Sequence, residues 1–277
     1  MDKIDNKPNW NIGIVGGMSI GKDFYGDGSD YDFEYLEKEM FVDIEKGSTI
    51  LVIASATNDG PNRNQQEEYT EVLRKKLTEN GYNCIFLKSS EFSNKERIKE
   101  LLQSSAVAIE LGGNTLAMVG YWNATGFSKS LIEAINNGMK YIGISAGAIA
   151  LFSKGLSDSY ISEGLSNDYY FVDGIGYFQN TLLVPHYSSR KNDKIMQMII
   201  EEPDKPIINI PNGVTLLIDE QNGLYKFIEQ PNRNIVYDNE TPSVIFPALG
   251  KRDFQIQKIG LLNEIILFQE NKKFTRK

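Results

Sequence analysis

The first two thirds of the chain alternate short, continuous apolar runs with longer stretches in which apolar residues recur at helical spacing. The apolar runs are rich in β-branched residues, which favour strands. A repeated strand–helix order with strands that are apolar throughout predicts a parallel sheet covered by helices on both faces. The expected strands are 11–16, 49–54, 83–87, 106–111 and 141–144, and the expected helices are 31–45, 64–80, 94–103 and a helical stretch that ends at Gly138.

The last third has a different pattern, in which short β-like segments lie between turn signals. We expect a strand at 182–184 and a helix at 191–200, followed by mostly antiparallel β structure. The predicted fold class is therefore α/β, a three-layer αβα arrangement with a mostly parallel sheet and extra antiparallel C-terminal segments. The turn signals are Asn212-Gly213, Asn222-Gly223 and Pro231-Asn232, and the expected late strands are 207–210, 215–218, 224–228, 254–256 and 265–268.

Composition narrows the class of protein. The chain has 277 residues, of which 41% are hydrophobic and 24% charged, and these values are typical of a globular protein and argue against a disordered one. No apolar run is long enough for a transmembrane helix, and the polar first ten residues lack the apolar core of a signal peptide. The single cysteine, Cys84, excludes an internal disulfide framework and a cysteine-rich zinc site. We therefore expect a cytoplasmic protein.

Charge and histidine content exclude further classes. The net charge is −8, and no Lys/Arg run carries interleaved aromatics, so we expect no nucleic-acid partner. With one histidine, His186, the chain cannot build a catalytic metal site from several His ligands. The same residue is the first candidate for a general base near neutral pH, because unperturbed imidazole titrates there.

The segment Gly143-Ile144-Ser145-Ala146-Gly147 has the G-x-S-x-G spacing of a serine nucleophile. It lies where a predicted strand meets a predicted helix. Such a sharp turn needs small neighbours and lifts the serine hydroxyl away from the backbone. Amide groups at the start of the next helix can stabilise a developing oxyanion. Ser145 is therefore the candidate nucleophile, and a tight turn with small residues for packing is the alternative interpretation.

His186 follows a predicted strand, and functional residues of α/β proteins collect at strand ends. A serine nucleophile needs a base within hydrogen-bond distance, which makes His186 the candidate base. A third residue should orient the imidazole and stabilise its charged form. The segment between Ser145 and His186 holds four acids, and the residues alone do not choose among them: Asp158, Glu163, Asp168 and Asp173.

Two glycine-rich segments also follow predicted strands. In Gly112-Gly113-Asn114-Thr115, glycines let backbone amides approach a ligand closely, so we expect the Gly113 amide to pair with that of Ala146 as an oxyanion hole. Asn114 is a candidate helix cap and a candidate substrate contact. Residues 16–22 match G-x-x-x-x-G-K, but Asp23 stands where a phosphate loop needs Ser or Thr, and we expect no nucleotide-phosphate site.

Three motifs, IELGGNT, YIGISAGA and GIGYFQNTLLVPHYSSR, occur in an order that resembles the peptidase E and cyanophycinase family of serine peptidases. The resemblance covers about residues 11–230. It implies a flavodoxin-like fold similar to that of the glutamine amidotransferases, with serine in place of the cysteine nucleophile. It also implies a catalytic domain at 1–230 and a β-rich extension at 231–277 that packs on the same domain.

The resemblance implies roles for individual residues. Ser145 resembles the family's nucleophile, His186 its base, and Gly113 and Ala146 its oxyanion donors. Arg190 resembles an arginine that grips a substrate carboxylate, a task that suits a charged, forked donor.

The family's acid lies between the serine and the histidine. Counting back from the DGIG segment gives Glu163, and counting forward from the serine comes closer to Asp158. The chain departs from the family at Asn212, where the peptidase tends to carry an acid, and in its longer C-terminal end.

The leading hypothesis is a serine hydrolase that acts on small aspartyl peptides and needs neither a metal nor an organic cofactor. We expect a small peptide substrate and no nucleic-acid or membrane partner, and a homodimer is left open. The alternatives are cyanophycinase-like hydrolysis of β-aspartyl-arginine and a catalytically silent, amidotransferase-like binding module. An α/β-hydrolase shares the G-x-S-x-G motif, but its histidine usually lies close to the C-terminus, unlike His186.

Overall fold

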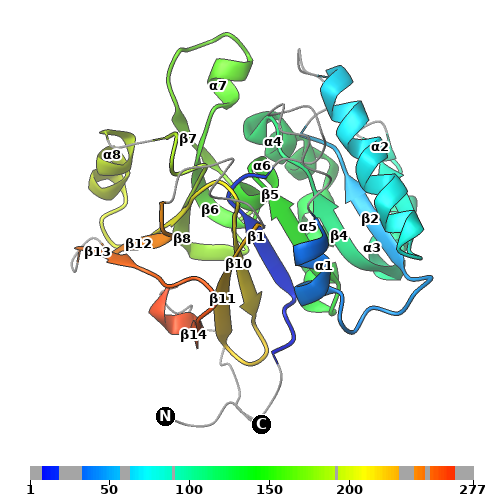
Figure 1. Ribbon diagram of the computed structural model, residues 1–277. Coiled ribbons are helices and arrows are strands. Elements are labelled where there is room, and N and C mark those ends of the chain that lie inside the picture. The colour runs from blue at the N-terminus through cyan, green and yellow to red at the C-terminus, as the bar shows by residue number, and fades with distance from the viewer. Residues whose placement is uncertain are drawn as a thin grey trace.

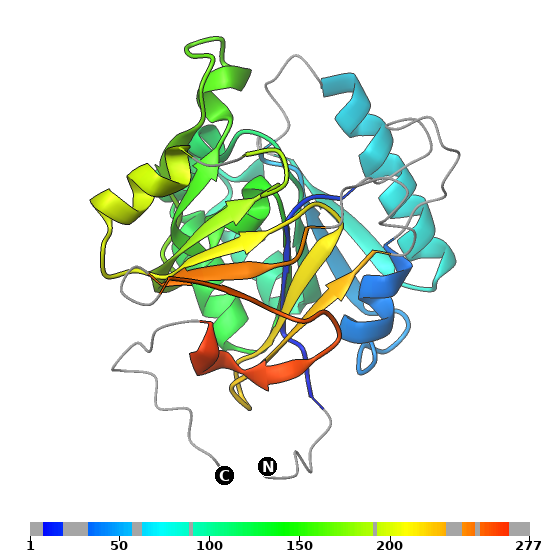
Figure 2. The same cartoon turned by 60° about the vertical axis from the view of Figure 1, so that its left-hand side comes forward.

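Two β-sheets, with helices between and around them, make up the computed structural model of the protein (Figures 1 and 2). The structure describes residues 8–18, 33–56, 63–88, 91–190, 193–230, 240–246 and 250–265. Among these residues, no helix has the length and apolar character that crossing a membrane requires.

The first sheet contains the five parallel strands that the sequence predicts, in the order β3-β2-β4-β5-β1. Strands β10, β11 and β14 extend it in antiparallel fashion beyond β1. The strands are β1 (Ile12–Val15), β2 (Thr49–Ile53), β3 (Asn83–Leu87), β4 (Ser105–Glu110), β5 (Lys140–Ile144), β10 (Val214–Asp219), β11 (Leu224–Glu229) and β14 (Ile259–Leu261).

Helices cover both faces of this sheet, because side chains on each strand alternate between two apolar layers. On β1, Ile12 and Ile14 enter one layer and Val15 enters the other. The first layer packs against α3 (Lys95–Ser104), α4 (Thr115–Thr125), α5 (Phe127–Asn136) and α6 (Ala146–Ala150), and the second against α1 (Glu34–Met40) and α2 (Arg63–Glu79). The predicted α/β class, with helices on both faces, is confirmed.

The second sheet lies beside this three-layer body and was not predicted as a separate sheet. Its central strands β6, β8 and β9 are parallel, and antiparallel strands flank them in the order β13-β12-β9-β8-β6-β7. One face joins the α3–α6 layer, and the other packs on α8 (Asp193–Glu201). The strands are β6 (Phe152–Ser157), β7 (Tyr170–Asp173), β8 (Phe178–Pro185), β9 (Ile207–Ile210), β12 (Ser243–Phe246) and β13 (Gly250–Asp253).

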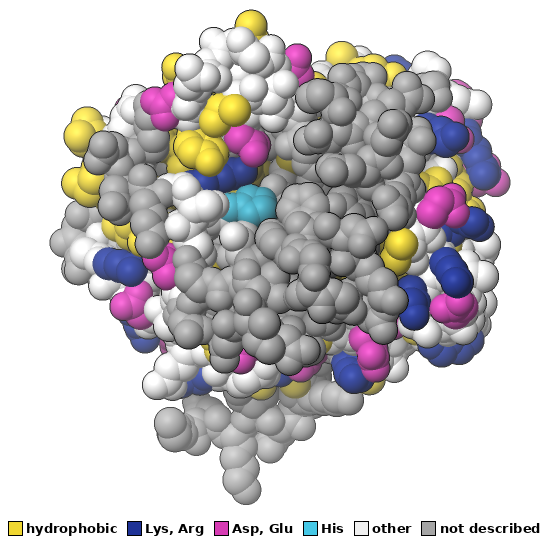
Figure 3. Space-filling model, turned by 45° about the horizontal axis from the view of Figure 1, so that its top comes forward, with side chains coloured by type: hydrophobic (Ala, Val, Ile, Leu, Met, Phe, Trp, Pro, Cys, Tyr) yellow, Lys and Arg dark blue, Asp and Glu magenta, His cyan; other side chains and the backbone are white. Residues whose placement is uncertain are grey.

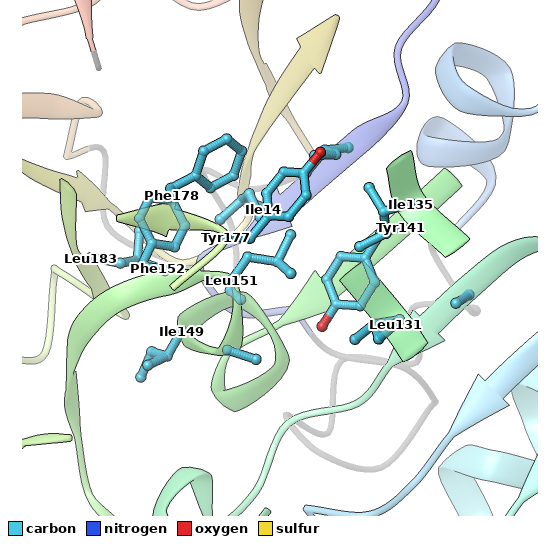
Figure 4. Close-up of a cluster of buried hydrophobic side chains, with 14 of the residues drawn as sticks. Ile14, Leu131, Ile135, Tyr141, Ile149, Leu151, Phe152, Tyr177, Phe178 and Leu183 are labelled. Carbon is cyan, nitrogen blue, oxygen red and sulfur yellow. The ribbon is translucent and has the colours of Figure 1, made fainter. Parts of the chain in front are cut away.

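The layer between the two sheets is the larger part of the core. Figure 4 shows its centre, where Ile14 and Tyr141 from the first sheet, Leu131 and Ile135 from α5, and Phe178 and Leu183 from β8 come together. All of these side chains are buried. The two sheets therefore share one apolar core, and their relative position is fixed by packing.

Several local expectations need correction. The long helical stretch before Gly138 is two helices, because Gly126 has φ +80° and ends α4. The predicted strand at 254–256 is wrong: β13 ends at Asp253, and Ile256 makes only an isolated bridge. Of the expected strand at 265–268, residues 266–268 lie outside the described residues, as does the turn at Pro231-Asn232.

Candidate active site

The ends of five strands converge on one place, where the two sheets meet. Ser145 follows β5, the Gly16-Gly17 pair follows β1 and the Gly112-Gly113 pair follows β4, all in the first sheet. His186 and Asn212 follow the parallel neighbours β8 and β9 of the second sheet. These are carboxyl ends of strands, where open α/β sheets bind their ligands.

The backbone at Ser145 has the geometry of a nucleophile turn. Its φ of 53° and ψ of −104° lie outside the ordinary regions for residues with a side chain. The Ser145 amide donates to the Val15 carbonyl at 3.1 Å, and its own carbonyl accepts from Ile149 at 3.0 Å. These bonds hold Ser145 between β5 and α6 in a conformation that costs about 1–3 kcal/mol.

His186 contacts Ser145 on one side and Asn212 on the other. The Nε2 atom of His186 lies 2.8 Å from Ser145 Oγ, and Nδ1 lies 2.5 Å from Asn212 Oδ1. Because an amide oxygen only accepts, Nδ1 must carry the proton. In the neutral ring Nε2 is then unprotonated and accepts from the Ser145 hydroxyl, which is the tautomer a general base requires.

Burial of the imidazole and, as the second cause, the positive charge of Arg190 lower the pKa of His186 to about 4. The hydrogen bond to Asn212 and the charge of Asp158 act in the opposite direction but do not outweigh burial. The ring is therefore neutral at pH 7. Figure 3 shows the histidine, in cyan, reaching the surface with basic and acidic side chains beside it.

The site has no room for a side chain at Gly17, the second glycine of the pair after β1. A Cβ atom at this position would lie 2.4 Å from His186 Nδ1 and 2.6 Å from Asn212 Oδ1. The Gly17 carbonyl also accepts from the Gly213 amide at 2.7 Å, and the Gly16 carbonyl accepts from the His186 amide at 2.9 Å. Gly17 therefore leaves room for the His186–Asn212 contact, and the remainder of the phosphate-loop match, 19–22, lies outside the described residues.

The two acids expected beside the imidazole have other partners. Glu163 accepts a hydrogen bond from the Asn114 side chain, and Asp158 forms an ion pair with Arg190 at 3.2 Å. The atom on Nδ1 belongs to Asn212, so the expectation of Asp158 or Glu163 at this position is corrected. Both acids flank α7 (Ser159–Ser162), in the connection between β6 and β7, whereas β9 directly neighbours β8 and brings Asn212 to the ring.

Arg190 lies close enough to His186 for its charge to act on the ring, but it is buried, with 4% of its surface exposed. Its guanidinium donates to the Leu156 carbonyl, pairs with Asp158 and lies 5.2 Å from the Tyr169 ring centroid. These contacts fix the position of the positive charge beside the site.

The candidate oxyanion segment runs past the nucleophile. A Cβ at Gly112 would lie 3.0 Å from Ser145 Cβ and 3.6 Å from Ser145 Oγ, so this backbone passes directly beside the hydroxyl. Asn114 caps α4 as predicted, since its Oδ1 accepts from the Ala117 amide at 3.0 Å. The donor roles of Gly113 and Ala146 stay predictions.

Taken together, these side chains can carry out acyl transfer. They supply a hydroxyl on a strained turn, a neutral imidazole that accepts its proton, and an amide oxygen that fixes the ring. Among the described residues, no group of three or more His, Cys, Asp or Glu side chains is arranged to hold a metal ion.

Comparison with known proteins finds relatives that are named as peptidases. The chain is 22% identical over 192 residues to peptidase E of Nostoc sp., covering 62% of this chain and 75% of that protein. It is 35% identical over 81 residues to the uncharacterized peptidase YgaJ of Bacillus subtilis, covering 29% of this chain and 32% of that one.

Two solved structures have similar folds. A peptidase from an acI-B1 actinobacterium superposes with a TM-score of 0.66 at 18% identity, covering 90% of this chain and 96% of that one. A putative peptidase E protein from Listeria monocytogenes has a TM-score of 0.52 at 19% identity, covering 89% and 99%. The model of peptidase family S51 matches residues 26–224, most of the chain. This chain therefore belongs to peptidase family S51.

Proposed function

We propose that this protein is a serine peptidase that hydrolyses small aspartyl peptides, with Ser145 as nucleophile and His186 as general base. One observation carries the proposal: the 2.8 Å contact between Ser145 Oγ and His186 Nε2, made by a serine with φ 53°. A serine at such an angle costs free energy, and a contact with an unprotonated ring nitrogen is what activates a hydroxyl.

The reaction follows the two-step chemistry of serine peptidases. Ser145 Oγ attacks the carbonyl carbon of the scissile bond while its proton passes to His186 Nε2. The carbonyl oxygen becomes an oxyanion that accepts from the amides of Gly113 and Ala146, each worth about 3 kcal/mol in comparable sites. The amine leaves with the proton from Nε2. Water then attacks the acyl group, with His186 again as base, and releases Ser145.

Asn212 takes the third position of the site. Its Oδ1 accepts the Nδ1 proton of His186, which selects the reactive tautomer and holds the ring toward Ser145. Cysteine peptidases with a Cys-His-Asn arrangement use an amide in the same position. An amide orients the ring but adds no negative charge to stabilise the imidazolium. We therefore expect the proposed Ser-His-Asn site to react more slowly than the same site with a carboxylate in the third position.

The aspartyl preference rests on charge. Arg190 is the cation, among the described residues, whose charge acts on His186. A fixed positive charge beside the reacting carbonyl favours a substrate that carries a carboxylate near the scissile bond. Its ion pair with Asp158 fixes that charge but also offsets part of it.

Two alternatives follow from other observations. Glu163, exposed beside Asn114, offers a carboxylate that could hold an arginine side chain, which favours the β-aspartyl-arginine substrate. Asn212, in a position where an acid would increase the basicity of His186, favours the silent binding module.

The test combines an active-site probe with a substrate screen. Wild type, Ser145→Ala and a control, Ser128→Ala on α5, would each be treated with a fluorophosphonate that esterifies activated serines, and the labelled residue located by mass spectrometry. The same proteins would be offered α-Asp-X dipeptides, β-Asp-Arg and non-aspartyl dipeptides.

We expect labelling at Ser145 and cleavage of α-Asp-X by wild type and Ser128→Ala, and neither by Ser145→Ala. Cleavage of β-Asp-Arg alone would move the substrate to the cyanophycinase side. A folded wild type that is neither labelled nor active would favour the silent module.

A further inference from the structure

A carboxyl group lies fully buried beneath the active site and takes no part in the chemistry described above. Glu110 is the last residue of β4, and its side chain has 0% of its surface exposed. On β4, Ala108 faces the α3–α6 layer while Val107 and Ile109 face the opposite layer. By the same alternation Glu110 faces α6, whose Gly147 it touches.

The Glu110 carboxyl is tied to the turn after β2. The Ser55 hydroxyl donates to it, at 3.3 and 3.4 Å from its two oxygens, and the Ala56 amide hydrogen-bonds to it as well. Ser55 is held in turn by Trp122, whose Nε1 donates to Ser55 Oγ at 2.8 Å. Burial raises the pKa of Glu110 well above its usual range, although the bonds from Ala56 and Ser55 act in the opposite direction.

This turn supports the segment that carries Gly113. The Ala56 carbonyl accepts from the Asn114 amide at 2.9 Å. A Cβ at Gly113, which has φ +144°, would lie 2.2 Å from the same carbonyl oxygen. The turn that donates to Glu110 through the Ala56 amide is therefore also in contact with the backbone of Gly113 and Asn114.

Glu110 also supports the helix that carries Ala146. A Cβ at Gly147 would lie 2.7 Å from Glu110 Cγ and 2.5 Å from the Glu110 carbonyl oxygen, so α6 rests directly on this residue. The Tyr141 hydroxyl, labelled in Figure 4, donates to the Gly147 carbonyl at 2.8 Å and fixes the same turn from β5. One buried side chain thus contacts the supports of both candidate donor amides.

We propose that Glu110 is a positioning residue that sets the spacing between the backbone segments of Gly113 and Ala146, and so the shape of the oxyanion hole. This inference rests on the proposed serine peptidase function. The Glu110 carboxyl accepts from Ala56 and Ser55 and keeps the volume beneath Gly147 filled. An apolar side chain keeps the volume but leaves the Ala56 amide without its acceptor.

The test uses Glu110→Leu, which removes the acceptor, and Glu110→Gln, which keeps an acceptor oxygen and nearly the same volume. Ile109→Val, on the opposite face of β4, is the matched control for a core substitution. The rate of fluorophosphonate reaction with Ser145 would be measured against probe concentration, which separates the maximal rate from the half-saturating concentration. Thermal unfolding of each variant would be recorded alongside.

We expect Glu110→Leu to lower the maximal rate by about tenfold or more, because oxyanion stabilisation is sensitive to small displacements of its donors. The half-saturating concentration should not change. Glu110→Gln should restore the rate to within about threefold of wild type, and Ile109→Val should match wild type. If Glu110→Leu does not fold, Ser55→Ala, which removes one partner of the carboxyl, should show a smaller loss of the same kind.

Other results would overturn the inference. A folded Glu110→Leu or Ser55→Ala that reacts at the wild-type rate removes the positioning role. Equal losses in Glu110→Leu and Glu110→Gln that follow their unfolding temperatures point to packing alone. A wild type that does not react removes the proposed function and this inference with it, a result visible without any variant.

Discussion

Asn212 gives His186 a fixed orientation without a charge, and this combination defines the reactivity of the site. The amide oxygen lies 2.5 Å from Nδ1, as close as a carboxylate would, but it stays neutral when the ring is protonated. A carboxylate would add Coulomb stabilisation of the imidazolium that forms during attack. The residue at this position is therefore one of the factors, beside burial and the charge of Arg190, that set how strong a base His186 is.

Replacing Asn212 with Asp should increase activity. The added carboxylate raises the pKa of His186 and stabilises the imidazolium, so the reaction rate of Ser145 near neutral pH should rise by about tenfold or more. Asn212→Ala removes the acceptor on Nδ1, and its rate should fall by a similar factor. Fluorophosphonate kinetics on the three proteins checks both signs. An Asn212→Asp variant slower than wild type, with unchanged fold, would contradict the proposed role.

The lowered pKa of His186 predicts that Ser145 stays reactive in the acidic pH range. The base must be neutral, so the rate should be level above about pH 5 and should fall as the pH drops through about 4. The ordinary value is 6.5, and between 6.5 and 4 the unfolded chain takes up a proton that the folded chain does not. Folding stability should therefore decrease as the pH falls through this window.

The two expectations are checked by measuring the reaction rate of Ser145 and the free energy of unfolding in urea across a pH range of about 3.5 to 8, which spans the ordinary and the lowered pKa of His186. In Asn212→Asp the acid limb of the rate should move to higher pH, because the new carboxylate favours the protonated ring. If the wild-type rate instead fell near pH 6.5, burial would not be lowering the pKa of His186.

The contact between Ser145 and His186 was predictable from local sequence, and the partner of the second ring nitrogen of His186 was not. Ser145 and His186 each follow a predicted strand, and each lies in a motif contained in one short segment of the sequence. Asn212 belongs to the site because β9 lies parallel to β8, with Val184 opposite Asn209, so their ends reach the same edge. Two signals were available: the expected strand at 207–210 followed by an Asn-Gly turn, and the position of Asn212 at a place where the family resemblance implies an acid. Only the strand order, which is a tertiary property, gives that turn its role.

Two helix caps of the same kind have different surroundings. Asn94 caps α3 by accepting from the Arg97 amide at 3.0 Å, and Asn114 caps α4 by accepting from Ala117 at the same distance. The Asn114 side chain also donates to Glu163, at the edge of the active site, whereas α3 packs against α5, β2 and β4.

Asn94→Ala and Asn114→Ala should each lower the free energy of unfolding by about 1 kcal/mol, because each removes an N-cap acceptor. Only Asn114→Ala should also reduce the reaction rate of Ser145, since Asn114 follows Gly113 directly. Urea unfolding gives the first quantity and probe kinetics the second. An Asn94→Ala variant with the same loss of rate would mean that stability alone accounts for the effect.

The elements that were missed share a physical cause. Strand β6 (FSKGLS) mixes polar and apolar residues and gives neither a continuous apolar run nor a clean alternation, and β7 (YFVD) is only four residues long and ends in an acid. Their pairing with each other and with β8 forms the strands, and this pairing is non-local. Strands β1, β2, β4 and β5 of the first sheet are largely apolar because they are buried on both faces, which is why they were predictable.

The C-terminal strands connect the two halves of the molecule. Strand β12 pairs with β9 in the second sheet, and β14 pairs with β11 in the first. Buried apolar side chains from this part of the chain enter the shared core: Val244, Phe254, Leu262 and Ile265. The expected extension beyond residue 230 therefore contributes to both sheets.

A chain that ends at Glu240 should not fold stably. Burying the side chains of Val244, Phe254, Leu262 and Ile265 contributes on the order of 10 kcal/mol, comparable with the total stability of an ordinary domain. Strands β9 and β11 would also become open edges that promote aggregation. Gel filtration and thermal unfolding check this, with full-length Lys251→Ala, on the exposed strand β13, as a control that should behave as wild type. A truncated monomer with an unchanged melting temperature would contradict it.

Ser145 and His186 both have positive φ, at 53° and 51°, so the contact between them joins two residues whose backbones lie in an uncommon region. Glycine at either position would relieve the backbone of that residue and would remove the contact at the same time. The backbone strain is therefore tied to the two side chains that the proposed reaction needs. A chain with glycine at either position would lose that reaction even where it kept the fold.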